Sequence, residues 1–154
     1  MVFKLVNSLS EILAIRHIRN ECREYLTNDT GYISIPQQIY WYFTYHKRAA
    51  KSGKYRIYLA RDDKGNPVGY GALHLIDREL LITECVAEKF RRQGYGYTIL
   101  KKLITIAEHK RLPLVAEIRA TNKISIALHK KCGFILEKTG VKSGFKLLTF
   151  RKEK

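Results

Sequence analysis

Residues 80–107 constrain the fold of this chain most. They consist of a continuous apolar run, a basic turn that contains glycines, and a segment in which apolar residues recur at helical spacing. Residues 80–87 are mostly apolar, as in a buried strand, whereas apolar residues recur at helical spacing from about Tyr95 to Ala107. A helix that follows such a turn offers unpaired backbone N–H groups and the positive end of its dipole. The stretch therefore predicts a strand–turn–helix unit suited to a phosphate or pyrophosphate group.

The residues of the turn strengthen this prediction. Two arginines add full positive charge, and two glycines let a ligand approach the backbone. A Walker-type loop is excluded because Gly-Lys-Ser/Thr is lacking, and a dinucleotide Gly-x-Gly-x-x-Gly motif is absent as well. The alternative is an ordinary strand-to-helix turn with a solvated basic face. The turn residues are Arg91, Arg92, Gln93, Gly94, Tyr95 and Gly96.

Two motifs resemble one known family. Arg91-x-x-Gly94-x-Gly96, with Val86 five residues earlier, closely resembles the acetyl-CoA pyrophosphate loop of the Gcn5-related N-acetyltransferases (GNAT). Residues 117–134 resemble the family's second signature, E-V-R-x-x-N-x-x-A-I-x-L-Y-x-K-x-G-F. The resemblance implies an α/β (α+β) GNAT fold. Its single mixed, largely antiparallel central sheet splays between strands 4 and 5 and carries about four helices.

The pattern along the chain agrees with that fold. Periodicity and turn signals predict the order β-α-α-β-β-β-α-β-α-β-β in a single domain, 1–154, without linker or repeat. Ser10 and Asn122 are expected to cap helices, and proline follows Ser34 in the first turn of another. The expected strands are 2–6, 55–61, 68–76, 80–87, 114–118, 134–138 and 146–150, and the helices are 9–25, one beginning near 34, 95–110 and 123–131.

Bulk properties narrow the class of protein. No apolar run approaches the roughly 18 residues of a membrane span, and no signal peptide is apparent, so we expect a cytoplasmic protein without membrane attachment. Three widely spaced cysteines indicate buried thiols, not disulfides or a zinc site. The net charge of +15 is unevenly spread, because residues 1–77 carry 11 basic and 7 acidic side chains and residues 78–154 carry 18 and 7. This excess indicates a polyanionic partner such as nucleic acid, or a basic solubilising surface.

The resemblance also implies a coenzyme site. Val86 should pair its backbone with the pantetheine arm of acetyl-CoA, and residues 91–96 should give N–H groups to the pyrophosphate. Asn122 and Lys131 should hold the arm or the nucleotide. No metal and no covalent nucleophile are needed for direct transfer to an amine.

Glu117 is the predicted general base, because the glutamate of the second signature serves as base in relatives that acetylate protein N-termini. The alternative is a structural glutamate paired with Arg119 or a lysine. Glu84 is the rival base, since many relatives place a carboxylate on the fourth strand.

His129 stands where the family usually has a tyrosine that protonates the coenzyme sulfur. A protonated imidazole could serve as this acid nearer neutral pH. Two alternatives remain open: His129 is an ordinary surface histidine of its helix, or the thiolate leaves without an acid.

The acceptor is the least determined part of the prediction. Five aromatic residues lie within 40–45, and we expect Trp41 and Tyr45 to wall an acceptor pocket, unless these rings are simply core. The charge favours an amine on a polyanion or nucleotide, and residues 18–38 faintly resemble relatives acting on nucleotide-linked amino sugars. A polycationic polyamine fits poorly. The alternatives are a protein N-terminal or lysine acetyltransferase and a catalytically inactive nucleic-acid-binding module. The chain is expected to be a monomer or homodimer.

Overall fold

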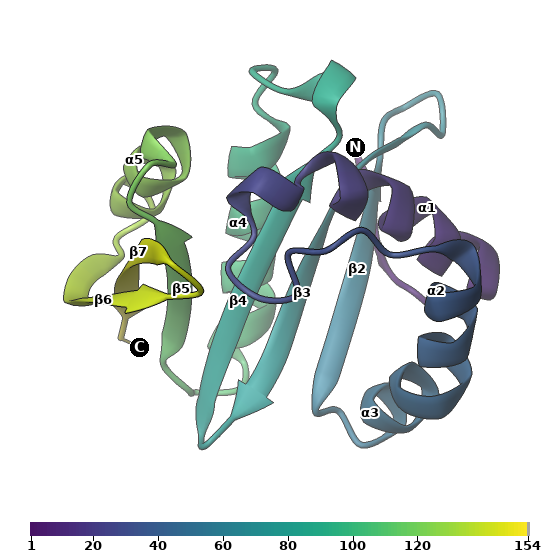
Figure 1. Cartoon of the computed structure of the whole chain (residues 1–154), viewed down its shortest axis with the longest axis horizontal. Helices are drawn as coiled ribbons and strands as arrows, with labels where there is room; N and C mark the ends of the chain where they lie inside the picture. Colours follow the sequence, from purple (N-terminus) through teal and green to yellow (C-terminus); the bar gives the residue numbers. More distant parts are fainter. Residues whose placement is uncertain (154) are drawn as a thin grey trace.

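A seven-stranded sheet forms the centre of the computed structural model, which describes residues 1–153 (Figure 1). The strand order is β1-β2-β3-β4-β5-β7-β6. All neighbours pair antiparallel except β4 and β5, which are parallel. The predicted mixed, largely antiparallel sheet is thereby confirmed. The strands are β1 (Val2–Leu5), β2 (Tyr55–Arg61), β3 (Pro67–Ile76), β4 (Glu79–Val86), β5 (Leu114–Arg119), β6 (Ile135–Lys142) and β7 (Phe145–Lys152).

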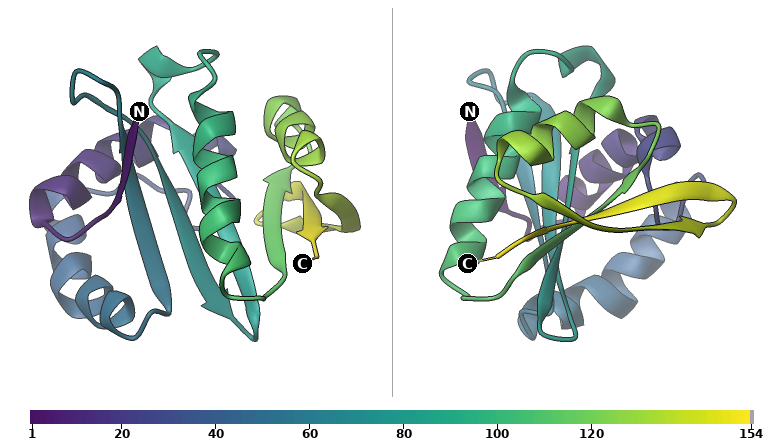
Figure 2. Two further views of the ribbon diagram at one scale, coloured as in Figure 1. Left: turned by 180° about the vertical axis from the view of Figure 1, so that it is seen from behind. Right: turned by 90° about the vertical axis from the view of Figure 1, so that its left-hand side faces the viewer.

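The helices lie in two layers on opposite faces of the sheet (Figure 2). The first layer holds α1 (Leu9–Glu21) and a continuous helical segment formed by α2 (Ile35–Trp41), the π-helical turn η2 (Tyr42–His46) and α3 (Lys47–Lys51). The second layer holds α4 (Tyr95–Glu108) and α5 (Lys123–Lys131). Short 3-10 turns, η1 (Arg23–Tyr25) and η3 (Glu88–Phe90), follow α1 and β4. The predicted order of strands and helices is confirmed.

The helix starts follow the capping rules, with one correction. Ser34 and Asn122 are N-caps whose side chains accept from the backbone three residues ahead. The cap of α1 is Ser8, so the predicted cap at Ser10 is wrong. Ser8 has the extended backbone of a cap, and Glu11 reaches back to its N–H, which completes a capping box.

Each helical layer has its own apolar core. On one face Ile99, Leu100 and Leu103 of α4 are fully buried against the sheet. The helix approaches β3 so closely that a Cβ at Gly71 would lie 2.5 Å from Leu103 Cδ1. On the other face α1 buries a row of isoleucines over β2 and β3. The two cores cover the central strands of the sheet on both faces, whereas β6 at its edge is exposed. Within the covered part, polar residues are confined to a few places.

One such place is the junction of β4 and β5. These strands pair only at Leu80–Leu114 and Leu81–Val115, although β4 continues to Val86. Beyond that pairing they diverge, which confirms the predicted splay (Figure 1). The divergence opens toward the end of the sheet where α4 begins, so the glycine-bearing turn lies beside the opening.

The three cysteines, Cys22, Cys85 and Cys132, are buried and free, as expected. Within residues 1–153, no helix combines the length and the apolar character needed to cross a bilayer.

Candidate active site

The turn before α4 presents backbone N–H groups. Arg92 and Gly94 have left-handed backbone, with φ of 60° and 85°. Gly94 is the N-cap of α4 and provides no side-chain cap, so the first N–H groups of the helix are left for a ligand. Alternating backbone of this kind forms an anion-binding concavity. The geometry suits the phosphate group predicted from the sequence.

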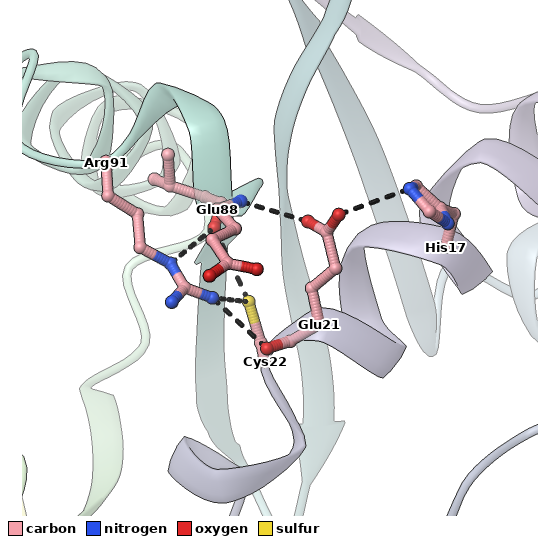
Figure 3. A network of polar contacts seen from close by, with 6 residues as sticks. His17, Glu21, Cys22, Glu88 and Arg91 are labelled. Atoms are coloured by element: carbon pink, nitrogen blue, oxygen red, sulfur yellow. Dashed lines mark hydrogen bonds and ion pairs between the residues drawn. The ribbon is translucent and has the colours of Figure 1, made fainter.

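Arg91 does not project into this concavity. Its guanidinium donates to the carbonyl oxygens of Val86 (Nε, 3.3 Å) and Glu21 (Nη2, 3.2 Å) and approaches Cys22 Sγ (Figure 3). Glu21 also accepts from the backbone N–H of Glu88 at 2.9 Å. Arg91 therefore ties the turn to the end of α1. Other cations, Arg92 within the turn and Lys131 of α5, must supply the positive charge near the concavity.

Lys131 supplies part of that charge. Its ammonium lies 5.0 Å from the ring centre of Tyr97, in the first turn of α4. Gly96, in the same turn, is close to Val86 and Leu128, because a Cβ on it would meet both at about van der Waals distance. The start of α4, the end of β4 and the helix α5 therefore lie next to one another.

Val86 turns its backbone toward the opening in the sheet. The N–H of Ala87 donates to Val68 O on β3 at 2.9 Å. Because successive backbone groups alternate in direction, the N–H of Val86 points away from β3, toward the side where β5 has diverged, whereas its carbonyl oxygen accepts from Arg91. Asn122 is engaged as the cap of α5 (Oδ1 to Ser125 N, 3.1 Å), and Gln93 donates to Lys89 O.

The two candidate bases lie on opposite faces of the sheet. Leu81 and Thr83 of β4 and Glu117 of β5 face α1 and α2, where they line a large pocket. Glu84, the next residue along β4, points to the other face and contacts His129 of α5. This alternation of strand side chains separates Glu84 from the pocket that receives Glu117.

The pocket has a volume of about 840 Å³. Its floor is the sheet from β2 to β5, and its walls are α1, α2, η2 and the loop 26–33. Trp41 and Tyr45 both line it, beside Tyr55 and His74. Trp41 packs 5.7 Å from Tyr45 and 6.0 Å from Tyr55 between ring centres. Burial raises the pKa of the Tyr55 hydroxyl well above its ordinary value.

Glu117 has a partner from a distant part of the chain. Lys142 Nζ lies 3.2 Å from Glu117 Oε2 and also donates to Asn28 Oδ1. Asn28 in turn donates to Glu117 at 3.5 Å. Arg119, the other partner considered from the sequence, instead donates to Leu26 O at 2.8 Å.

His129 and Glu84 form a buried pair. His129 is 1% exposed, so it is not a surface histidine. Its Nδ1 lies 2.9 Å from Ser125 O, and since a carbonyl oxygen only accepts, Nδ1 carries a proton. Its Nε2 lies 3.6 Å from Glu84 Oε2. Burial raises the pKa of the Glu84 carboxyl, and attraction to His129 opposes this rise in part.

Comparison with known proteins identifies the family. The sequence model of the "Acetyltransferase (GNAT) family" matches residues 12–134, which is most of the chain. The chain belongs to this family. The resemblance carried by the two motifs is thereby confirmed. A search of curated proteins found no match.

Solved structures share the GNAT fold over nearly the whole chain. A ribosomal-protein-alanine N-acetyltransferase from Brucella melitensis has 24% identity and a TM-score of 0.84, covering 100% of both chains. The protein yncA from Salmonella typhimurium, solved with its cofactor acetyl-CoA, has 22% identity and a TM-score of 0.80, covering 99% of this chain and 93% of its own. A spermidine N-acetyltransferase from Vibrio cholerae, in complex with CoA and spermine, has 14% identity and a TM-score of 0.81, covering 98% and 94%.

Sequence reasoning missed several residues of the GNAT pocket. Lys142 and Asn28 reach Glu117 from positions 25 and 89 residues away, and no local pattern announces either contact. Arg19 lines the pocket from α1 and was not singled out. Among residues 1–153, no group of three or more His, Cys, Asp or Glu side chains could hold a metal ion.

Proposed function

We propose that this GNAT chain transfers an acetyl group from acetyl-CoA directly to an acceptor amine, with Glu117 as general base. The observation that carries the proposal is the position of Glu117, the sheet residue whose carboxylate lines the pocket beside the β4–β5 divergence. An alkylammonium with a pKa of about 10.4 is not a nucleophile, so a group in the pocket must take its proton. Glu84 faces away from that pocket.

The residues around the turn fit acetyl-CoA. The uncapped start of α4 and the left-handed backbone of Arg92 and Gly94 suit the pyrophosphate, with Lys131 close by. The backbone N–H of Val86 is directed to the open side of β4, where an extended pantetheine arm would add like a strand, while its carbonyl oxygen stays with Arg91. Two GNAT neighbours were solved with acetyl-CoA and with CoA, which supports acetyl-CoA as the ligand.

For the leaving thiolate we propose His129 as acid. Ser125 O holds Nδ1–H, so Nε2 is the atom that would carry the transferred proton. Within residues 1–153 this buried nitrogen makes no hydrogen bond. Glu84, whose Oε2 lies 3.6 Å from Nε2, would keep the imidazole oriented.

The acceptor proposed here is an amine that is not polycationic. The pocket lining includes two full cations, Arg19 and Lys142, against two carboxylates, Asp29 and Glu117. A polyamine such as the spermine of the Vibrio cholerae neighbour would meet as many positive as negative groups. An amine on an anionic molecule, such as a nucleotide-linked amino sugar, is favoured by the net charge of +15 of the whole chain, not by the balanced lining. A protein N-terminus or lysine is the second candidate, favoured by the fold shared with the Brucella melitensis protein.

The test combines three variants with two measurements. Acetyl-CoA binding is measured by calorimetry, and thiol release is measured with a panel of amino sugars on nucleotides, peptides and polyamines. We expect Glu117→Gln to bind acetyl-CoA normally and to lose turnover by a factor of about 10² to 10⁴, the usual contribution of a general base. Glu84→Gln is the matched control on the opposite face and should lose less. His129→Ala should lose more turnover at the acidic than at the alkaline end of a pH 6 to 9 profile, because only a protonated imidazole can act as the acid.

Each variant has an outcome that contradicts its role. Unchanged turnover in Glu117→Gln with a large loss in Glu84→Gln would move the base to β4. A His129→Ala protein with wild-type turnover across the profile would remove the acid assignment. If the wild-type chain failed to bind acetyl-CoA, the proposed activity itself would be wrong.

A further inference from the structure

The acceptor pocket already contains an amine of the chain itself. Lys142 Nζ lies 3.2 Å from Glu117 Oε2, inside the pocket that both residues line. An acceptor ammonium about to lose its proton to Glu117 must lie within hydrogen-bond reach of the same carboxylate. Lys142 therefore occupies the position that the proposed function gives to the acceptor amine.

The fold holds Lys142 at this position. It is the last residue of β6 and pairs with Phe145, so only Ser143 and Gly144 form the turn to β7. Both turn residues have left-handed backbone, with φ of 51° and 80°, as in a tight two-residue hairpin. The hairpin thus fixes the backbone of Lys142, and its long side chain reaches into the pocket lining.

The ion pair leaves Lys142 free to react. The side chains of Lys142 and Glu117 are 39% and 26% exposed, and ion pairs this open to water are weak. Asn28 accepts a second hydrogen bond from the ammonium and donates to Glu117. This arrangement directs the nitrogen toward the carboxylate without burying it.

We propose that Lys142 is an internal acetyl acceptor and that the chain acetylates itself there when no other amine fills the pocket. This inference rests on the proposed function. Glu117 takes one proton from the ammonium, and the free amine attacks the thioester carbonyl of acetyl-CoA. A C–N bond forms, the C–S bond breaks, and the electron pair leaves with the sulfur. The second proton of the nitrogen goes to that thiolate, and Glu117 returns the first to solvent. The products are acetylated Lys142, CoA and a proton.

Self-acetylation would change the acceptor site. The neutral amide no longer pairs with Glu117, so the carboxylate becomes available to an external ammonium. It also removes one of the two full cations that line the pocket. Lys142 is thus both a substrate and a competitor of the true acceptor.

The test uses the full wild-type chain and acetyl-CoA alone. After incubation, acetylation of Lys142 and of Lys138 is followed by mass spectrometry of digests. Lys138 is the internal control, because it lies on the same strand, is exposed and does not line the pocket. We expect Lys142 to react about a hundredfold faster than Lys138, at a rate independent of protein concentration. Glu117→Gln should slow Lys142 by a similar factor and leave Lys138 unchanged.

Equal rates at Lys142 and Lys138, or a rate at Lys142 that rises with protein concentration, would overturn the internal-acceptor proposal. If either outcome were found in a protein that binds acetyl-CoA and acetylates an external amine, the proposed function would stand and only the internal-acceptor proposal would fall. If calorimetry showed no acetyl-CoA binding, both would fall. Lys142→Arg keeps the positive charge but cannot form the acetyl-lysine, so acetylation of this variant that was as fast as that of Lys142 in wild type would also contradict the proposal.

Discussion

At the scale of single residues, the pairing of each carboxylate decides what it can do. Glu117 is partly exposed in a pocket and faces a partly exposed lysine, whereas the side chain of Glu84 is only 10% exposed and faces a buried histidine. The first arrangement allows proton exchange with a ligand. The second suits a positioning residue, because desolvation and a fixed neighbour restrain the group. Two carboxylates that the sequence left as rivals thus have different surroundings.

Burial of Glu84 predicts a pH dependence of stability. Its carboxyl has a pKa raised above 4.5 in the folded chain, chiefly by desolvation. A group whose folded pKa lies above its unfolded pKa contributes its full stability below the unfolded value and loses it as the pH rises through the folded value. We therefore expect the free energy of unfolding of wild type, relative to Glu84→Gln, to fall as the pH rises above 4.5, by about 1.4 kcal/mol per unit of pKa difference.

Urea unfolding of both proteins at successive pH values measures this difference. Glu108→Gln, at the exposed end of α4, is the control and should show no such trend. A difference between wild type and Glu84→Gln that stayed constant with pH would mean that Glu84 titrates alike in the folded and unfolded chain.

At the scale of elements, the turn and the start of α4 form one unit. The backbone of the turn is set by Gly94 at positive φ, and its position is set by the contacts of Arg91 with the end of α1. The sequence predicted the unit but assigned Arg91 to the phosphate. Its actual direction depends on α1, which is about 70 residues away in the chain.

A matched pair of glycines separates binding from stability. Gly94 and Gly65 both have φ of 85° and open space where a Cβ would lie, but only Gly94 is in the turn before α4. We expect Gly94→Val and Gly65→Val to lose similar stability, at least about 1 kcal/mol each, from left-handed strain. Only Gly94→Val should lose acetyl-CoA binding in calorimetry. Normal binding by a folded Gly94→Val protein would contradict the proposed phosphate site.

At the scale of the whole molecule, the charge of +15 exceeds what one coenzyme needs. A few cations suffice for the phosphates of CoA, and the pocket itself is balanced in charge. The remaining positive charge acts over the surface, where it attracts polyanions without specifying them. This property alone does not indicate a nucleic-acid-binding function.

Salt dependence distinguishes the two possibilities. We expect binding to duplex DNA or RNA to be independent of sequence and to weaken steeply between about 50 and 200 mM salt, as binding through phosphates alone does. Acetyl-CoA binding should weaken much less over that range. Sequence-preferring nucleic-acid binding that survived high salt, in a protein without acetyl-CoA affinity, would favour the nucleic-acid-binding module instead.

The sequence by itself determined the elements and the family. Alternation, helical spacing and caps are local properties, so strands, helices and the glycine-bearing turn could be predicted to within a few residues; the cap at Ser8 was missed because two serines compete there. Only the tertiary structure decided which groups share a site. Neighbouring residues of one strand, such as Thr83 and Glu84, point to opposite faces of the sheet. Lys142 on β6 reaches Glu117 on β5, although β7 lies between these strands. Such contacts depend on strand register and hairpin position, which arise from packing of distant segments and leave no local trace in the sequence.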